Sequence, residues 1–129
     1  MQAGQLKILT AAVKDVNAAL ATFQKNFGFA VTRRAADASA GTESAFLRIG
    51  AAEIELASSR GGAIAESIGQ RGEGLFQIEL EVDDLQAAER ELSERGMRAD
   101  FETDAGGRRV LRIAIEHTHG VPLLLSQAR

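Results

Sequence analysis

The sequence predicts an α+β fold made of two similar halves, each running strand, helix, strand, strand, strand. The first observation is an internal repeat, because VKDVNAAL starting at Val13 matches VDDLQAAE starting at Val82 with an offset of 69 residues. The same offset pairs Ile54-Glu55-Leu56 with Leu123-Leu124-Leu125. Two separate matches at one offset indicate that the chain contains a duplicated unit.

The second observation is the alternation of residue types in the first strand of the second half. From Phe76 to Val82, apolar residues at every second position are separated by Gln77, Glu79 and Glu81. Because successive side chains of a β-strand point to opposite faces, this pattern predicts a half-buried strand. The repeat extends the prediction to the first half, where Ile8 corresponds to Gln77.

The third observation is a helix signal after each of these strands. Asp15 and Asp84 are candidate N-caps, because an aspartate oxygen there accepts from the first free backbone N–H groups of a helix. Apolar residues then recur at helical spacing for about three turns. Gly28 and Gly96 follow, and each suits the left-handed position that ends a helix.

Three further strands are expected in each half, at about residues 29–36, 43–50 and 52–58 and at about 98–104, 109–117 and 121–127. Pro122 has no backbone N–H, so it should lie at a strand start or edge. We expect a single domain, 1–129, with repeat one at about 5–59 and repeat two at about 74–127. The glycine-rich stretch between them, about 60–73, is interpreted as a flexible connector.

Composition excludes several classes of protein. Fifteen Lys and Arg against eighteen Asp and Glu give a formal net charge of −3, which argues against a nucleic-acid partner. No apolar run approaches the ~20 residues that span a bilayer, and no secretory leader pattern is seen at the N-terminus. The absence of cysteine excludes disulfides, thiolate metal sites and cysteine nucleophiles. We therefore expect a cytoplasmic protein without a membrane partner.

A helix packed on one face of each half leaves the other face of the sheet to be covered or to bind a ligand. We expect the two free faces to form an inner face around a central cleft. From the alternation alone, the inner face is predicted to carry Ile8, Thr10, Glu53, Glu55, Gln77, Glu79, Glu81, Arg112, Leu124 and Ser126. The aromatic residues Phe46, Phe76 and Phe101 are expected in the core rather than as stacking platforms.

The duplicated strand–helix–strand–strand–strand pattern resembles the vicinal oxygen chelate superfamily. The segments that carry the resemblance are LKILTAAVKDVNAALATFQKNFGF, GEGLFQIELEVDDLQAAERELSERG and THGVPLLLSQ. This superfamily includes glyoxalase I, bleomycin-resistance proteins, extradiol dioxygenases and methylmalonyl-CoA epimerase, and the last two segments look most like the epimerase branch. The resemblance implies curled mixed sheets around a cleft (the glyoxalase/bleomycin-resistance fold) and a homodimer.

The resemblance also implies four positions for metal ligands, two in each half. Carried over to this chain, they are Ile8, Glu55, Gln77 and Leu124, which form two pairs at the offset of 69. Ile8 and Leu124 have no donor atom, and two remaining ligands rarely hold a transition metal tightly. We therefore expect no metal and no cofactor.

The remaining polar positions each have two interpretations. Glu55 is either a general base, its pKa raised by desolvation, or the ion-pair partner of Arg48 or Arg112. Gln77 either orients a ligand carbonyl or bonds to a neighbouring side chain. Thr10 is included among the ligand-binding candidates because it shares the predicted inner face.

Further candidates lie in the second half. Glu79 belongs either to an acidic groove for a cationic ligand or to a solvated strand face, and Arg112 is placed to neutralise part of it. His117 and His119 form the only H-x-H of the chain. They are interpreted either as a site pair, with His119 bordering a ligand, or as loop residues near the end of the seventh strand.

These observations favour a protein that binds a small organic molecule in a metal-free cleft. The alternative is a metal-independent isomerase, epimerase or lyase that abstracts a proton next to a carbonyl, with Glu55 as base and Gln77 orienting the carbonyl oxygen. A structural or partner-binding module is the third class. Whether the protein is an enzyme, and which ligand it takes, are left open by the sequence.

Overall fold

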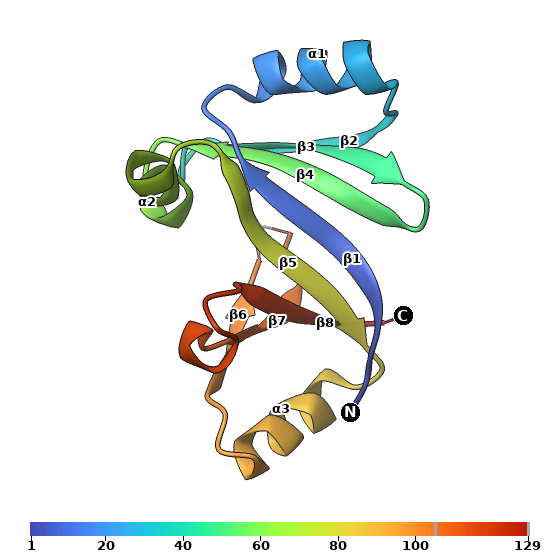
Figure 1. Ribbon diagram of the computed structural model, residues 1–129, viewed down its shortest axis with the longest axis vertical. Helices are drawn as coiled ribbons and strands as arrows, with labels where there is room; N and C mark the ends of the chain where they lie inside the picture. Colours follow the sequence, from blue (N-terminus) through green and yellow to red (C-terminus); the bar gives the residue numbers. More distant parts are fainter. Residues whose placement is uncertain (105, 129) are drawn as a thin grey trace. The chain divides into compact units, whose positions relative to one another are not determined.

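The computed structural model describes residues 1–104 and 106–128. The chain divides into two compact units, which we call the first unit (Ile8–Phe76) and the second unit (Met1–Lys7 with Gln77–Arg129). In chain order the elements are β1 (Ala3–Ala12), α1 (Val16–Phe27), β2 (Val31–Asp37), β3 (Thr42–Ile49), β4 (Ala52–Ser59), α2 (Gly62–Arg71), β5 (Gly74–Val82), α3 (Leu85–Glu94), β6 (Ala99–Thr103), β7 (Arg109–Ile113), the short 3-10 helix η1 (Ile115–His117) and β8 (Leu123–Gln127). Figure 1 shows the predicted order of strand, helix and three strands twice along the chain.

The sheet of the first unit has the strand order β2-β3-β4-β1. β1 pairs with β4 in parallel, and the other two pairings are antiparallel. Helix α1 packs on one face through Val16 and Leu20, which meet the buried strand residues Ala45, Leu47 and Leu56. This spacing of four residues along α1 is the amphipathic pattern that the sequence predicts.

The second unit repeats this plan with the order β5-β8-β7-β6. β5 pairs with β8 in parallel, and β7 pairs antiparallel with both β6 and β8. Helix α3 packs its apolar face against the sheet through Leu85, Ala88 and Leu92, which meet Leu111 and Leu125. Each unit thus has its own apolar core between one helix and one face of its sheet.

The helix ends form as predicted. Asp15 accepts a hydrogen bond from the Ala18 N–H at 3.1 Å, and Asp84 accepts from the Ala87 N–H at 3.0 Å. Gly28 ends α1 with a positive φ of 69° that favours glycine over residues with a Cβ. Local sequence signals therefore fix where both helices begin.

The prediction of a flexible connector at 60–73 is wrong, because this segment contains helix α2. Glycines occur at both ends of the segment, but the residues from Ala63 to Ile68 include good helix formers. The predicted strand at 109–117 is also too long. It ends at Ile113, and η1 follows. In the part of the chain that the structure describes, no helix is long and apolar enough to cross a membrane.

The alternation of the strands places polar residues on the sheet face opposite the helix in each unit, and we call this the polar face. In the first unit it carries Thr10, Ser44, Phe46, Glu53 and Glu55, whereas their sequence neighbours pack against α1. In the second unit it carries Gln77, Glu79, Glu81, Arg112, Leu124 and Ser126. Which side chains share a face was thus predicted correctly within each unit, whereas a cleft between the two halves stays a prediction.

Replacing Asp84 by alanine should lower the free energy of unfolding by about 1 kcal/mol, because α3 loses its side-chain cap. Asp83→Ala is the matched control, since Asp83 precedes the cap and should change the stability far less. Urea unfolding followed by circular dichroism measures both values. Equal effects of the two variants would contradict the capping role of Asp84.

Candidate functional site

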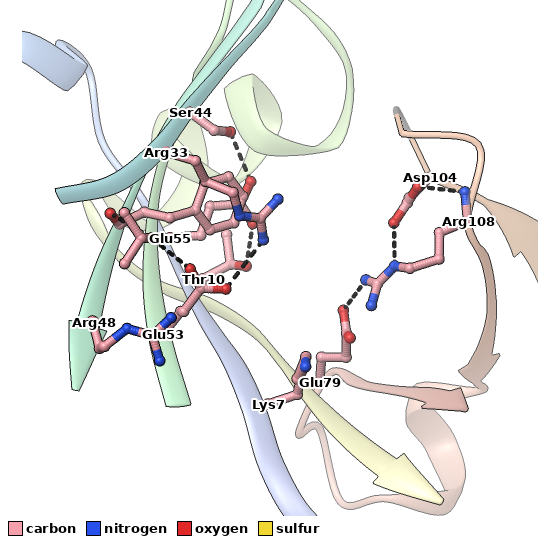
Figure 2. Close-up of polar contacts among 12 residues, drawn as sticks. Lys7, Thr10, Arg33, Ser44, Arg48, Glu53, Glu55, Glu79, Asp104 and Arg108 are labelled. Carbon is pink, nitrogen blue, oxygen red and sulfur yellow. Dashed lines mark hydrogen bonds and ion pairs between the residues drawn. The ribbon is translucent and has the colours of Figure 1, made fainter. Parts of the chain in front are cut away.

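The polar face of the first unit is organised around the carboxylate of Glu55. Thr10 Oγ1 donates to Glu55 Oε1 at 2.7 Å, and Ser44 Oγ donates to Oε2 at 2.7 Å (Figure 2). Thr10 is buried at 2% exposure, whereas Glu55 is partly buried. Both hydrogen-bond partners that Glu55 has among the described residues are therefore hydroxyls, and Arg48 of the same unit forms no ion pair with it. Each oxygen keeps a further lone pair for a hydrogen-bond donor.

A row of facing side chains crosses all four strands at this point. Thr10 of β1 lies opposite Glu55 of β4, which lies opposite Phe46 of β3, which lies opposite Arg33 of β2. The Arg33 guanidinium carbon lies 3.7 Å from the centre of the Phe46 ring, within the range of a cation–π contact. Phe46 is buried at 6% exposure, as predicted for a core residue, but it also forms a stacking platform.

A β-bulge directs two successive side chains toward one carboxylate. The register between β2 and β3 shifts between Val31 and Arg33. Thr32 Oγ1 donates to Glu53 Oε2 at 2.6 Å, and Arg33 Nη2 donates to Glu53 Oε1 at 3.1 Å. Without the bulge, strand alternation would send Thr32 and Arg33 to opposite faces. Glu53 lies beside Arg33 in Figure 2.

The pKa of Glu53 lies below the ordinary glutamate value. Burial raises this pKa, but the hydrogen bonds from Thr32 and Arg33 and the charges of Arg33 and Arg48 lower it by more. Arg48 lies directly opposite Glu53 in the pairing of β3 with β4. The carboxylate of Glu53 on β4 is therefore held in its ionised form by Thr32 and Arg33 of β2 and by Arg48 of β3.

The polar face of the second unit pairs its acids with cations. Arg108 Nη2 donates to Glu79 Oε1 at 2.8 Å, and Arg108 Nε donates to Asp104 Oδ2 at 3.0 Å. Lys7 Nζ lies 3.3 Å from Glu81 Oε2. The negative charges of Glu79 and Glu81, which one interpretation assigned to an acidic groove, are therefore neutralised by Arg108 and Lys7.

Gln77 and Arg112 are brought together in the same unit. Arg112 Nη2 donates to Gln77 Oε1 at 3.3 Å, while Arg112 Nε donates to Glu102 Oε2 at 2.7 Å. Gln77 thus bonds to a neighbouring side chain through its only acceptor atom, which was one of its two interpretations. Leu124, opposite Arg112 in the pairing of β7 with β8, is buried at 5% exposure.

On the polar face of the second unit, two buried side-chain oxygens have no hydrogen-bond partner among the described residues, Glu79 Oε2 and Ser126 Oγ. Glu79 is 5% exposed and Ser126 is 1% exposed. Both lie on the polar face, on the paired strands β5 and β8. Because an unpaired buried polar atom is costly, they mark the least satisfied part of this face.

The two histidines do not share a strand. His117 ends η1, and His119 lies in the following turn with a positive φ of 55° and an exposed side chain. Both histidines therefore lie in the segment between β7 and β8, which does not decide between the two interpretations of the pair. That His119 borders a ligand stays a prediction.

The residues at the family's four metal-ligand positions do not fit a metal ion. Ile8 and Leu124 offer buried hydrocarbon, at 6% and 5% exposure. The Gln77 oxygen already accepts from the cationic Arg112, and both Glu55 oxygens accept from hydroxyls. Within residues 1–104 and 106–128, no group of three or more His, Asp or Glu side chains is placed to hold a metal.

The structure divides the sequence-predicted candidates between the units. Ile8, Thr10 and Glu55 lie together in the first unit, and Gln77, Glu79, Arg112 and Leu124 lie together in the second. Sequence reasoning missed Thr32, Arg33, Ser44, Lys7 and Arg108. The orientation of Thr32 and Arg33 depends on a bulge, and Arg108 follows a turn. The alternation of a regular strand therefore gives no signal for these three residues.

Residues 9–111 match the sequence profile of the Glyoxalase/Bleomycin resistance protein/Dioxygenase superfamily, so the chain belongs to this superfamily. It has the α+β fold of that group, as the sequence predicts. No curated protein matches the sequence significantly.

Solved structures show the same fold. A hypothetical protein from Bacillus halodurans C-125 is 24% identical, with a TM-score of 0.88 over 97% of this chain and 94% of that one. Methylmalonyl-CoA epimerase from Mycobacterium tuberculosis is 25% identical, with a TM-score of 0.85 over 96% of this chain and 88% of that one. A variant epimerase from Streptomyces coelicolor, in complex with 2-nitronate-propionyl-CoA, is 21% identical, with a TM-score of 0.85 over 98% of this chain and 100% of that one.

Replacing Glu53 by glutamine should make the free energy of unfolding fall less steeply as the pH is lowered below about 5. The pKa of Glu53 is lower in the folded chain than in the unfolded chain, so its carboxylate contributes stability above the unfolded pKa. That contribution is lost as the pH falls through the folded pKa. Urea unfolding at a series of pH values between about 5 and 3 measures the slope. Thr32→Val removes one donor to Glu53, so its slope should lie between the slopes of wild type and Glu53→Gln. If Glu53→Gln has the same slope as wild type, the lowered pKa of Glu53 is refuted.

Proposed function

We propose that this protein binds a small organic molecule on its polar faces without the help of a metal ion. The observation that carries the proposal is the chemistry at the four family positions, where Ile8 and Leu124 are buried hydrocarbon and Arg112 donates to the Gln77 oxygen. A guanidinium beside the only acceptor of Gln77 repels a metal cation, whereas it is compatible with an organic anion or a carbonyl group.

The polar faces offer the groups that small-molecule sites use. In the first unit, an aromatic ring, a half-exposed guanidinium and a carboxylate with two hydroxyl partners share one row of the sheet. Ligand sites combine apolar surface with a few oriented polar groups, and rigid strands hold such groups well. The epimerase structures in complex with methylmalonyl-CoA and with 2-nitronate-propionyl-CoA support a small-molecule role for this fold. A homodimer and a cytoplasmic location remain predictions.

Calorimetric titration of purified, tag-free protein tests the proposal. The titrants are acyl-CoA esters, small carboxylic acids and cationic antibiotics, before and after dialysis against EDTA. We expect saturable binding of at least one titrant with a dissociation constant that changes less than about twofold on EDTA treatment. Glu55→Gln should weaken that binding, while Glu43→Gln, on the other face of β3, should not.

Two results would contradict this proposal. One is a stoichiometric amount of nickel, cobalt, zinc or iron in the purified protein, with binding that EDTA abolishes. The other is the absence of saturable binding across the whole panel, which would favour a structural or partner-binding role.

A second candidate function is a metal-independent isomerase, epimerase or lyase in which Glu55 is the base. It is favoured by the position of Glu55, whose carboxylate is fixed by Thr10 and Ser44 and, within the described part of the first unit, forms no ion pair. In this reaction the C–H bond next to a carbonyl breaks, the proton moves to a Glu55 oxygen, and the electron pair moves toward the carbonyl oxygen. The resulting enolate needs stabilising donors, since no metal is invoked.

Deuterium exchange separates the two functions. Methylmalonyl-CoA is incubated with wild type or Glu55→Gln in deuterated water, and incorporation is followed by mass spectrometry. The binding function predicts no protein-dependent exchange. Exchange by wild type that falls by about a hundredfold or more in Glu55→Gln would establish the alternative, and equal exchange in both would remove Glu55 from the mechanism.

A further inference from the structure

We propose that Arg33 is the specificity-determining residue of the first unit and that it binds the carboxylate of a small organic acid carrying a hydroxyl or ammonium group. This inference rests on the proposed binding function and names the class of its ligand. The site consists of Arg33, Phe46, Glu53 and Arg48, and the Glu55 carboxylate lies two residues beyond Glu53 on the same strand, β4. It lies wholly within the first unit.

The guanidinium of Arg33 is held in a fixed plane while part of it stays open. It stacks at 3.7 Å on the buried Phe46 ring, and Nη2 donates to Glu53 Oε1 at 3.1 Å. The side chain of Arg33 is nevertheless 53% exposed. A guanidinium has five N–H donors in a rigid fork, so stacking and one bond to Glu53 leave donors for a planar carboxylate.

The bulge in β2 makes this arrangement possible. Because the register shifts between Val31 and Arg33, both Thr32 and Arg33 reach Glu53. β-bulges are found next to binding sites because they change the direction of one side chain. Here the result is a carboxylate with two donors that serves as the anchor of Arg33.

The charges of the first unit's polar face favour a monoanion. Arg33 and Arg48 both flank Glu53, so two cations share one carboxylate at this end of the face. Glu55 adds a negative charge on the same strand as Glu53, two residues further along. A carboxylate can meet Arg33 and keep away from Glu55, whereas a phosphate dianion would be repelled more strongly by Glu55.

The same geometry sets the size of the ligand and its second group. Neighbouring strands are about 4.8 Å apart, and the Arg33 guanidinium lies over β3, next to the strand that carries Glu55. The Glu55 oxygens accept hydrogen bonds, so the ligand must supply a donor there. A short acid with a hydroxyl or ammonium group a few atoms from its carboxylate meets both requirements.

Nuclear magnetic resonance titration of the isotope-labelled 129-residue chain tests this proposal with four probes. 3-Hydroxybutyrate has both groups, butyrate has only the carboxylate, 1,3-butanediol has only hydroxyls, and inorganic phosphate is a different anion. We expect 3-hydroxybutyrate to bind most tightly and to shift the amides of β2 and β3. Arg33→Gln should weaken it by about tenfold or more, because a charge-assisted bidentate contact is lost.

Arg34→Gln is the matched control, since Arg34 is the next residue of β2 and its Nη2 bonds to Asn17 of α1 at 2.7 Å, on the other face. It should change the affinity by less than about twofold. Arg33→Lys keeps the charge but loses the planar fork, so it should bind with intermediate affinity. Thermal unfolding of each variant shows whether it is folded, and Arg33→Lys serves as the test if Arg33→Gln does not fold.

Several results would overturn the inference. One is that Arg33→Gln and Arg34→Gln weaken the binding of 3-hydroxybutyrate equally. Another is that 1,3-butanediol binds as tightly as 3-hydroxybutyrate, and a third is that phosphate binds more tightly than 3-hydroxybutyrate. If no acid binds but another titrant of the calorimetric panel does, this inference fails while the proposed function stands. If nothing in either experiment binds, both fail.

Discussion

The structure depends on a constraint that follows from packing one helix on one face of each sheet. α1 and α3 bury the apolar face of their units, and the opposite face carries polar side chains of which Thr10, Glu79 and Ser126 are also buried. Glu79, for example, is 5% exposed and carries a charge. Since burying an unpaired charge is costly, each acid of these faces needs a hydrogen-bonding or charged partner from another segment of its unit.

The two units meet this constraint with different chemistry, although their backbones repeat. The second unit uses cations, with Arg108 on Glu79 and Lys7 on Glu81. The first unit uses the hydroxyls of Thr10 and Ser44 for Glu55. A carboxylate with hydroxyl partners keeps its negative charge and can still accept a hydrogen bond from a ligand. The charge of an ion-paired carboxylate is cancelled by its cation, and fewer of its lone pairs are open to a ligand. The duplicated fold has thus produced two unlike surfaces, as expected when function resides in side chains rather than in the fold.

Much of the fold could be predicted from local signals because those signals act through the nearest backbone. Asp15 and Asp84 fix the helix starts, and strict alternation from Phe76 to Val82 fixes which side chains share a face. The segment 60–73 misled the prediction, since glycine composition alone cannot distinguish a loop from a short helix bounded by glycines. Most of the site could not be predicted, because Arg33 and Thr32 reach Glu53 only after the register slips by one residue.

The sequence by itself determined the duplication, the two helix starts and the loss of donor atoms at Ile8 and Leu124, since each is a property of residue type or short-range spacing. The tertiary structure alone decided which partner each charged group has. Arg112 was a candidate partner for Glu55, yet it bonds to Gln77 and Glu102, and Glu55 bonds to two hydroxyls. Long side chains choose among several neighbours within reach, and strand register, which local sequence does not encode, decides which neighbours those are.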